Sequence, residues 1–549
     1  MKAYLLLSRA WLFFCVLLVV IPVAVIVAAI GEFDAEIWEF LLDYQLPVLL
    51  KNTLFLAVAV GFGVVFLGAS SAWLLAMYRF PLSGVLKWAM MLPLAVPAYV
   101  LAFTQLGFFE YSGMASTYLR EQWGFENGLP DIRNGMGVAA VMSLAFYPYV
   151  YLLAKNAFST MGTRALEVGA SLGLSPWRAF FFVALPMARP WIAGGLMLAL
   201  MEVLADFGTV SIFGFETFTT AIYDAWFGFF SLETAKQLAS LLIGFVFLLV
   251  LLESLSRKKR RFEQAGRSAD VVQKQLTGVR AFFACAWCLG ILVAGFILPV
   301  AQLLAWVVDY WQFVDFSALF GQAWHSLVTA LLAAFFVAMA ALFLVLAQHY
   351  DGSKLATAGL KVATLGYAIP GSVLAVGVFV PVAALDNVLI DWLGLEAGSA
   401  IFKGTIFVMV LALVLRFLAL GVSSVSAGFA RVKPSYVEAA QSLGVAGFGM
   451  LKSVYVPLLK GSLGVALLMT FVDVMKEMPI TLMMRPHDWD MLSVRIYSFT
   501  MEGMYDRAAL PALIIVLVGL VPVIGFSNIG QQRLKKADID MPSHDASAK

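Results

Sequence analysis

The sequence predicts an all-α integral membrane protein with about twelve transmembrane helices, arranged as two related six-helix halves. Of its 549 residues, 62% are hydrophobic and only 13% are charged, whereas about a quarter of the residues in a soluble domain are charged. Apolar runs long enough to cross roughly 30 Å of hydrocarbon recur along the chain. Because lipid offers backbone groups no hydrogen-bond partner, unbroken apolar runs of this length indicate helices.

Each long apolar run is interpreted as one membrane span. The twelve runs lie at about 11–30, 52–77, 88–109, 135–153, 190–212, 236–254, 281–308, 324–347, 362–384, 402–421, 462–483 and 509–526. The first run follows a basic start and resembles a signal peptide. Its removal would invert all later segments relative to the charge pattern, so we interpret it as a retained helix.

Charge predicts the orientation. If the first terminus, with Lys2 and Arg9, is cytoplasmic, then Lys and Arg concentrate in the cytoplasmic segments and Asp and Glu in the outer ones. This positive-inside distribution predicts that both termini are cytoplasmic. The basic run RKKRR at Arg257–Arg261 lies between spans six and seven. We interpret it as a topology anchor against membrane lipid rather than as a nucleic-acid site.

A semi-polar segment occurs twice in this apolar chain. VEAAQSLGVAGFGMLKSVYVPLL, from Val437, repeats the outline of LEVGASLGLSPWRAFFFVALPMA, from Leu166. Three pairs lie 271 residues apart: Glu167 and Glu438, Gly173 and Gly444, and Pro186 and Pro457. Six spans in each half predict a parallel repeat with a pseudo-two-fold axis along the membrane normal. The expected units are a first half at 1–255, a basic cytoplasmic linker at 256–280 and a second half at 281–549.

The doubled segment predicts a short helix along the membrane surface, ended by a turn, since Gly accepts a left-handed backbone at little cost. From Glu438 the pattern is E-A-A, three residues, Gly, nine residues, Val-x-Val-Pro. This spacing resembles the EAA loop of the permease subunits of binding-protein-dependent ABC importers. In the first copy, Val168 and Gly169 stand where that family usually has Ala-Ala.

The resemblance implies that each loop is a coupling helix, so that two copies of a separate ATP-binding subunit dock on the chain. It also implies a soluble substrate-binding protein and a bacterial cytoplasmic (inner) membrane. The residues that the resemblance assigns to ATPase coupling are Glu167, Gly169, Ala170, Gly173, Glu438, Ala439, Ala440 and Gly444. No GxxxxGK[ST] occurs in the sequence, so this phosphate-binding loop is missing. The chain is therefore expected to be a transport subunit without catalytic residues or a cofactor, with ATP and Mg bound by the partner ATPase.

Charged residues within the expected spans are candidates for a transport path. The candidates are Glu202, Asp206, Asp473, Glu477 and Lys476. Each carboxylate pair is spaced i, i+4, which places both side chains on one helical face. Lys476 is the expected countercharge, either to Asp473 or to a neighbouring helix. An oxygen-rich path suits a hard metal cation. The alternative is that the carboxylates brace the gate by hydrogen bonds between helices, and the residues alone leave both open. No metal ligands are assigned.

Two stretches indicate the cargo. Residues Ala205–Phe227 and Lys476–Leu513 resemble the matching regions of ferric-iron permeases with two fused halves. This resemblance implies ferric iron as cargo, with thiamine, a polyamine or phosphonate as alternatives within the same importer class. A secondary transporter driven by an ion gradient is the alternative from another class. By the same resemblance, the outer loops after spans five and eleven receive the binding protein. Their aromatic residues are Trp226, Phe229, Trp489, Tyr497 and Tyr505.

Overall fold

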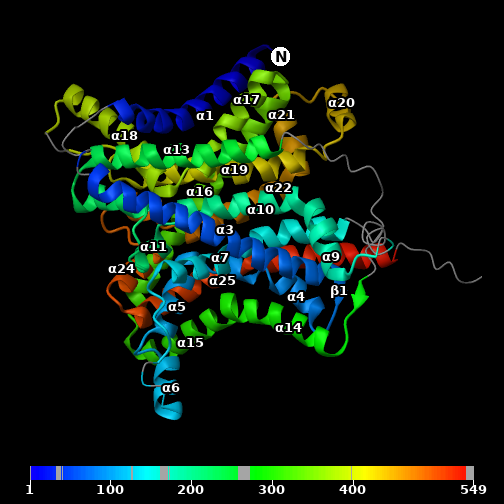
Figure 1. The fold of residues 1–549 in the computed structure, drawn as a ribbon. Coiled ribbons are helices and arrows are strands. Elements are labelled where there is room, and N and C mark those ends of the chain that lie inside the picture. Colours follow the sequence, from blue (N-terminus) through cyan, green and yellow to red (C-terminus); the bar gives the residue numbers. More distant parts are fainter. Residues whose placement is uncertain are drawn as a thin grey trace, which may run out of the picture.

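The computed structural model describes residues 2–31, 39, 41–124, 126, 128–160, 171, 173–257, 273–396 and 399–539. Nearly all of these residues lie in helices, most of which run side by side in one direction (Figure 1). The strands within this part of the chain are β1 (Tyr78–Arg79) and β2 (Lys274–Gln275), a short parallel pair. The predicted all-α class is confirmed.

Eleven helical segments are long and apolar enough to cross a membrane, and a bent pair makes a possible twelfth. The main helices of the eleven are α1 (Lys2–Ala28), α3 (Leu46–Met77), α7 (Gly135–Thr160), α10 (Leu185–Ala205), α13 (Leu232–Arg257), α14 (Gly278–Leu292) with α15 (Leu298–Tyr310), α16 (Phe316–Asp351), α18 (Gly371–Leu393), α19 (Ile406–Phe429), α22 (Val456–Lys476) and α25 (Tyr505–Ile539). Their number and order agree with the predicted spans.

The third expected span is broken. It consists of α4 (Ser83–Ala89), η3 (Leu92–Ala95) and α5 (Ala98–Phe109), and its two parts meet at 95°. Pro97 stands at the break with φ −57° and ψ 145°. Proline has no N–H with which to continue a helix, so the run of apolar residues could not reveal how sharply the chain turns here.

The second half repeats this interruption. α17 (Lys354–Ala363) and η8 (Leu365–Ala368) precede Pro370, after which α18 begins. The expected span at 362–384 therefore becomes continuous helix only from Gly371. Equivalent elements begin at nearly constant offsets: 271 residues between α4 and α17 and between α10 and α22, and 273 between α5 and α18. The element order repeats along the chain, and the two-fold axis itself stays a prediction.

The first helix of each half packs against the other half. α1 contacts α16, α17 and α18, whereas α14 contacts α3 and α4, and α15 contacts α5. An ion pair of 2.9 Å between Arg9 Nη2 and Asp351 Oδ1 joins α1 to the end of α16. Within the first half, α3, α7 and α10 pack closely. A Cβ on Gly195 would lie 2.7 Å from Val150 Cα, so the small residue is what lets the two backbones approach.

The end of the linker docks on the first half. Gln273 Nε2 donates to the carbonyl oxygens of Leu75 and Ala76 at 3.0 Å each, which satisfies acceptors at the end of α3. Gln273 Oε1 accepts a hydrogen bond of 2.9 Å from Lys87 Nζ. The linker predicted at 256–280 thus begins within the end of α13 and ends within α14, and its residues 258–272 lie outside the described part of the chain.

Candidate functional site

The second doubled segment forms the predicted surface helix. α20 (Pro434–Ser442) begins with proline at its first position, where the missing N–H costs nothing. It ends before Gly444, whose φ of +77° is left-handed. Glu438 and Ala439 are exposed, and Ala440 is buried against the body of the protein. α20 lies at the periphery, at the same end of the molecule as β1 (Figure 1).

Most of the first doubled segment cannot be compared. Glu167, Gly169 and Ala170 lie outside the described residues. Gly173 is described, and its φ of +78° matches that of Gly444. The turn that the sequence predicts is therefore present after both copies.

Two of the four intramembrane carboxylates hold helix starts. Asp206 follows α10 and Glu477 follows α22, each just before a short helix, α11 (Gly208–Ile212) or α23 (Pro479–Met484). The Asp206 Oδ1 atom accepts the backbone N–H of Thr209 at 2.9 Å. These contacts satisfy the free N–H groups at a helix start.

Glu477 makes the equivalent contacts. Its Oε1 accepts the N–H of Ile480 at 2.8 Å, and its Oε2 accepts the N–H of Thr481 at 3.1 Å. Glu477 also pairs with Arg416 of α19, whose Nη1 lies 3.3 Å from Oε1. For Asp206 and Glu477, the geometry favours the bracing alternative.

Arg416 is the functional candidate that the sequence analysis missed. A Cβ on Gly371 would collide with its guanidinium, so the start of α18 is shaped around the ion pair. The available signal was an arginine within the expected span 402–421, because an intramembrane charge marks a functional or structural site by default. Its partner, 61 positions away in the sequence, could not be read from helical spacing.

Glu202, Asp473 and Lys476 lie where the two halves meet. The Tyr367 hydroxyl of η8 donates to Glu202 Oε1 at 3.1 Å. In the opposite sense, Lys476 Nζ donates to the Leu94 carbonyl of η3 at 2.8 Å. Of the two partners expected for Lys476, the structure thus selects a neighbouring segment for its hydrogen bond, although Asp473 and Glu202 remain within electrostatic reach of the ammonium.

The central charges are not sealed from solvent. Glu202, Asp206, Asp473 and Lys476 are each partly exposed, whereas Glu477 is buried. Among the described residues, no three His, Cys, Asp or Glu side chains are arranged to hold a metal ion. The arrangement offers separate oxygen ligands along a path rather than a preformed metal centre.

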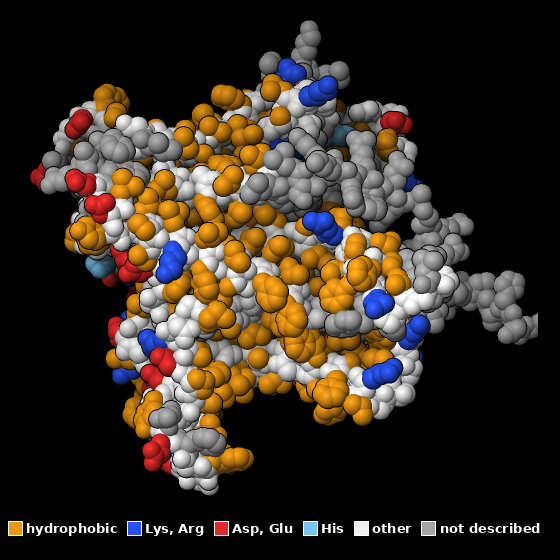
Figure 2. Space-filling view, viewed as in Figure 1, with side chains coloured by type: hydrophobic (Ala, Val, Ile, Leu, Met, Phe, Trp, Pro, Cys, Tyr) orange, Lys and Arg blue, Asp and Glu red, His pale blue; other side chains and the backbone are white. Residues whose placement is uncertain are grey.

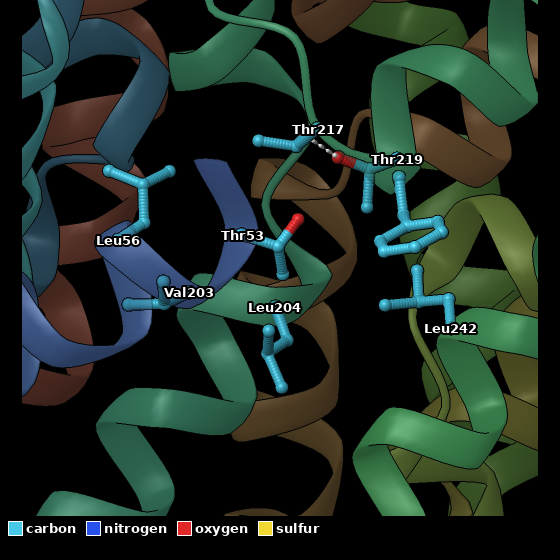
Figure 3. Close-up of a pocket in the computed structure, with 8 residues that line it drawn as sticks. Thr53, Leu56, Val203, Leu204, Thr217, Thr219 and Leu242 are labelled. Carbon is cyan, nitrogen blue, oxygen red and sulfur yellow. Dashed lines mark hydrogen bonds between the residues drawn. The ribbon is translucent and has the colours of Figure 1, made fainter. Parts of the chain in front are cut away.

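A small cavity lies beside the start of this region. Thr53, Thr217 and Thr219 line it together with apolar side chains such as Leu56 and Val203 (Figure 3). Its volume of about 10 Å³ suits one water molecule at most, and the Thr53 hydroxyl is buried without a hydrogen-bond partner. A larger hollow of about 500 Å³ opens near α20 and is lined by residues of α19 and α22. Cargo could occupy only the larger one.

The aromatic residues of the outer loops are mostly structural. Trp489 stacks on His325 with ring centroids 4.0 Å apart and donates to Thr329 Oγ1 at 3.1 Å. Tyr497 and Tyr505 are each only 8% exposed. Phe229, at 69% exposure, is the one of the five predicted aromatic residues that presents a large free surface.

Charge is distributed unevenly over the visible face. Acidic side chains gather at the end that carries α11, α24 (Leu492–Met501) and α6 (Met114–Trp123), and basic ones at the end that carries β1 (Figure 2). Hydrophobic side chains cover most of the surface between the two ends. The apolar band with a basic and an acidic end is what a membrane protein with a positive inner side presents.

Residues 64–261 match the family described as binding-protein-dependent transport system inner membrane component. Over 88% of its length, the chain is 27% identical to the Fe(3+)-transport system permease protein FbpB 2 of Haemophilus influenzae, of which 90% is covered. It is 24% identical to the ferric transport system permease protein FbpB of Actinobacillus pleuropneumoniae, over 89% of this chain and 73% of the relative. A shorter match, 34% identical over 30% of this chain, covers 71% of the molybdenum transport system permease protein ModB of Azotobacter vinelandii.

Proposed function

Because the chain belongs to the family of binding-protein-dependent transport system inner membrane components, we propose that it is the transmembrane permease of an ATP-driven importer for ferric iron. The observation that carries the cargo is coverage. The two relatives matched over most of this chain are named as ferric or Fe(3+) permeases, whereas the molybdenum permease matches only 30% of it. The chain transports and does not catalyse a reaction.

We place the ATP-binding subunits at α20 and at the equivalent first loop. α20 supports this, since it is a short helix that stands clear of the membrane body. Two nearby apolar side chains, Leu443 and Phe448, are 83% and 74% exposed. Large apolar side chains exposed beside each other mark protein interaction sites. Two ATPase copies would supply ATP and Mg, so the chain itself needs no cofactor.

The unequal charge of the two ends supports the remaining assignments. We place the basic end, with both termini, in the cytoplasm and the acidic end outside, where the substrate-binding protein delivers iron. In this orientation cargo passes between Glu202 and Asp473 and leaves through the hollow near α20. Carboxylate oxygens suit a hard trivalent cation, and partial exposure leaves these two accessible to it.

The test is uptake of radioactive ferric iron by cells that lack other iron systems and express this chain with its ATPase and binding protein. Glu438→Arg should abolish uptake and reduce co-purification of the ATPase, because it reverses a charge on the coupling helix. Glu502→Arg, an exposed position at the other end of the molecule, is the control and should keep the ATPase bound. Absence of iron uptake by the intact system would refute the cargo, and ATPase binding unaffected by Glu438→Arg would refute the docking site.

A further inference from the structure

The intramembrane charges divide into two groups. Asp206 and Glu477 are committed to helix starts, and Glu477 also to Arg416. This leaves Glu202 and Asp473, one from each half, and a single cation near both, Lys476. Glu202 accepts its hydrogen bond from a neutral phenol, and no hydrogen bond to Asp473 is found within the described part of the chain. The two free carboxylates therefore share one ammonium group.

The protein holds Lys476 in a shaped slot. Its Nζ reaches across to the Leu94 carbonyl of the first half at 2.8 Å. Its stem passes α25 at Gly519, where a Cβ would lie 2.9 Å from Lys476 Cε and would also collide with the Ala95 carbonyl. Because a side chain at position 519 would obstruct the lysine, glycine there keeps the path to Leu94 open.

The ammonium is supplied by one half alone. Position 205, which lies 271 residues before Lys476, is Ala205. The Tyr367 contact to Glu202 comes from η8, and η3 occupies the equivalent place in the first half with Leu94. A purely structural contact between the halves would need no charge at this point, since the Tyr367 contact is made by a neutral group.

We propose that the Lys476 ammonium is a resident cation that occupies the carboxylate pair Glu202 and Asp473 in the closed permease, and that a multivalent metal cation must displace it in order to pass. The inference rests on the proposed function, because it concerns the same path. One tethered positive charge neutralises only part of the pair. A trivalent ion therefore outcompetes it, whereas a monovalent ion gains little. The lysine thereby closes the path to abundant monovalent cations.

The experiment measures binding of Tb³⁺, a hard trivalent probe whose luminescence is sensitised by nearby aromatic rings. The full-length permease is purified into nanodiscs of neutral phosphatidylcholine. Lys476→Gln removes the charge but keeps an N–H donor for the Leu94 carbonyl. We expect it to lower the Kd for Tb³⁺ by about tenfold or more, because it removes the competing charge. Adding Glu202→Gln in the same chain should abolish this gain.

Lys460→Met is the matched control, since Lys460 is exposed on the same helix and its loss changes the net charge equally. It should bind Tb³⁺ as the unmodified protein does. Lys476→Gln with unchanged Tb³⁺ affinity, or a gain equal to that of Lys460→Met, would overturn the inference. Lys476→Arg, which keeps the charge, provides a second variant and should not bind more tightly. Tighter Tb³⁺ binding without any iron uptake would leave the inference standing and refute only the cargo, whereas iron uptake with unchanged Tb³⁺ binding would do the reverse.

Discussion

Replacing Arg416 with Leu tests whether the ion pair with Glu477 holds the break between α22 and α23. The side chains of Arg416 and Glu477 are 13% and 2% exposed. Removing one partner of a buried pair costs about 3–5 kcal/mol, because the other charge stays buried without compensation. Glu477 keeps the N–H groups of Ile480 and Thr481, and hydrogen bonds to a charged group contribute about 1.5–3 kcal/mol each. We therefore expect the lower end, about 3 kcal/mol.

The assay is equilibrium unfolding of the purified protein in mixed micelles, followed by tryptophan fluorescence. Glu477→Gln is measured alone and together with Arg416→Leu. Because the two side chains form one unit, the double variant should lose less free energy of unfolding than the two single losses together, by about 1–3 kcal/mol.

Arg431→Leu is the control, since Arg431 is exposed and surface substitutions usually change stability by no more than about 0.5 kcal/mol. A loss below about 1 kcal/mol for Arg416→Leu, or strict additivity in the double variant, would show that the N–H groups of α23 alone hold Glu477. The reasoning about the pair would then be wrong.

Two further predictions follow from the packing. Gly519→Ala should lower the free energy of unfolding by about 1–3 kcal/mol in the same assay, because the new Cβ collides with η3 and with the stem of Lys476. Gly525→Ala on the same helix, with nothing within 4 Å, should be neutral or stabilising, and equal losses at both glycines would contradict the slot. Burial raises the pKa of Tyr497 from 10.0 to about 12, so its contribution is complete below pH 10.0 and is lost as the pH rises towards 12. Tyr497→Phe should therefore lose less stability than the unmodified protein between these pH values, and identical alkaline profiles would refute the shift.

The sequence carried the membrane spans and the coupling helix because both depend on local pattern. Apolar length predicted the helices, and a Glu and small residues followed by Gly444 predicted where α20 ends. The central contacts were different. Tyr367 meets Glu202 across 165 positions, and Lys476 meets Leu94 across 382. No helical period reports contacts of that kind, because they depend on how the two halves come together.

The same limit explains why the four carboxylates had to be treated alike. Asp206 and Glu477 share i, i+4 spacing with Glu202 and Asp473, yet they lie just past the ends of α10 and α22, where free N–H groups need acceptors. Where a helix ends decided their role. Hydropathy continues smoothly through these ends, so it could not place them.

The exchange of first helices between the halves has a consequence for how the protein is made. α1 packs on α16, α17 and α18, which are synthesised about 290–365 residues later. At about 5–20 residues per second, α1 waits in the bilayer for roughly 15–70 seconds before its packing partners exist. During that time its Arg9 lacks the Asp351 partner that it has in the finished protein. Assembly of the first half is therefore completed only after the second half has been translated, which makes a single continuous chain an advantage over two separately encoded halves.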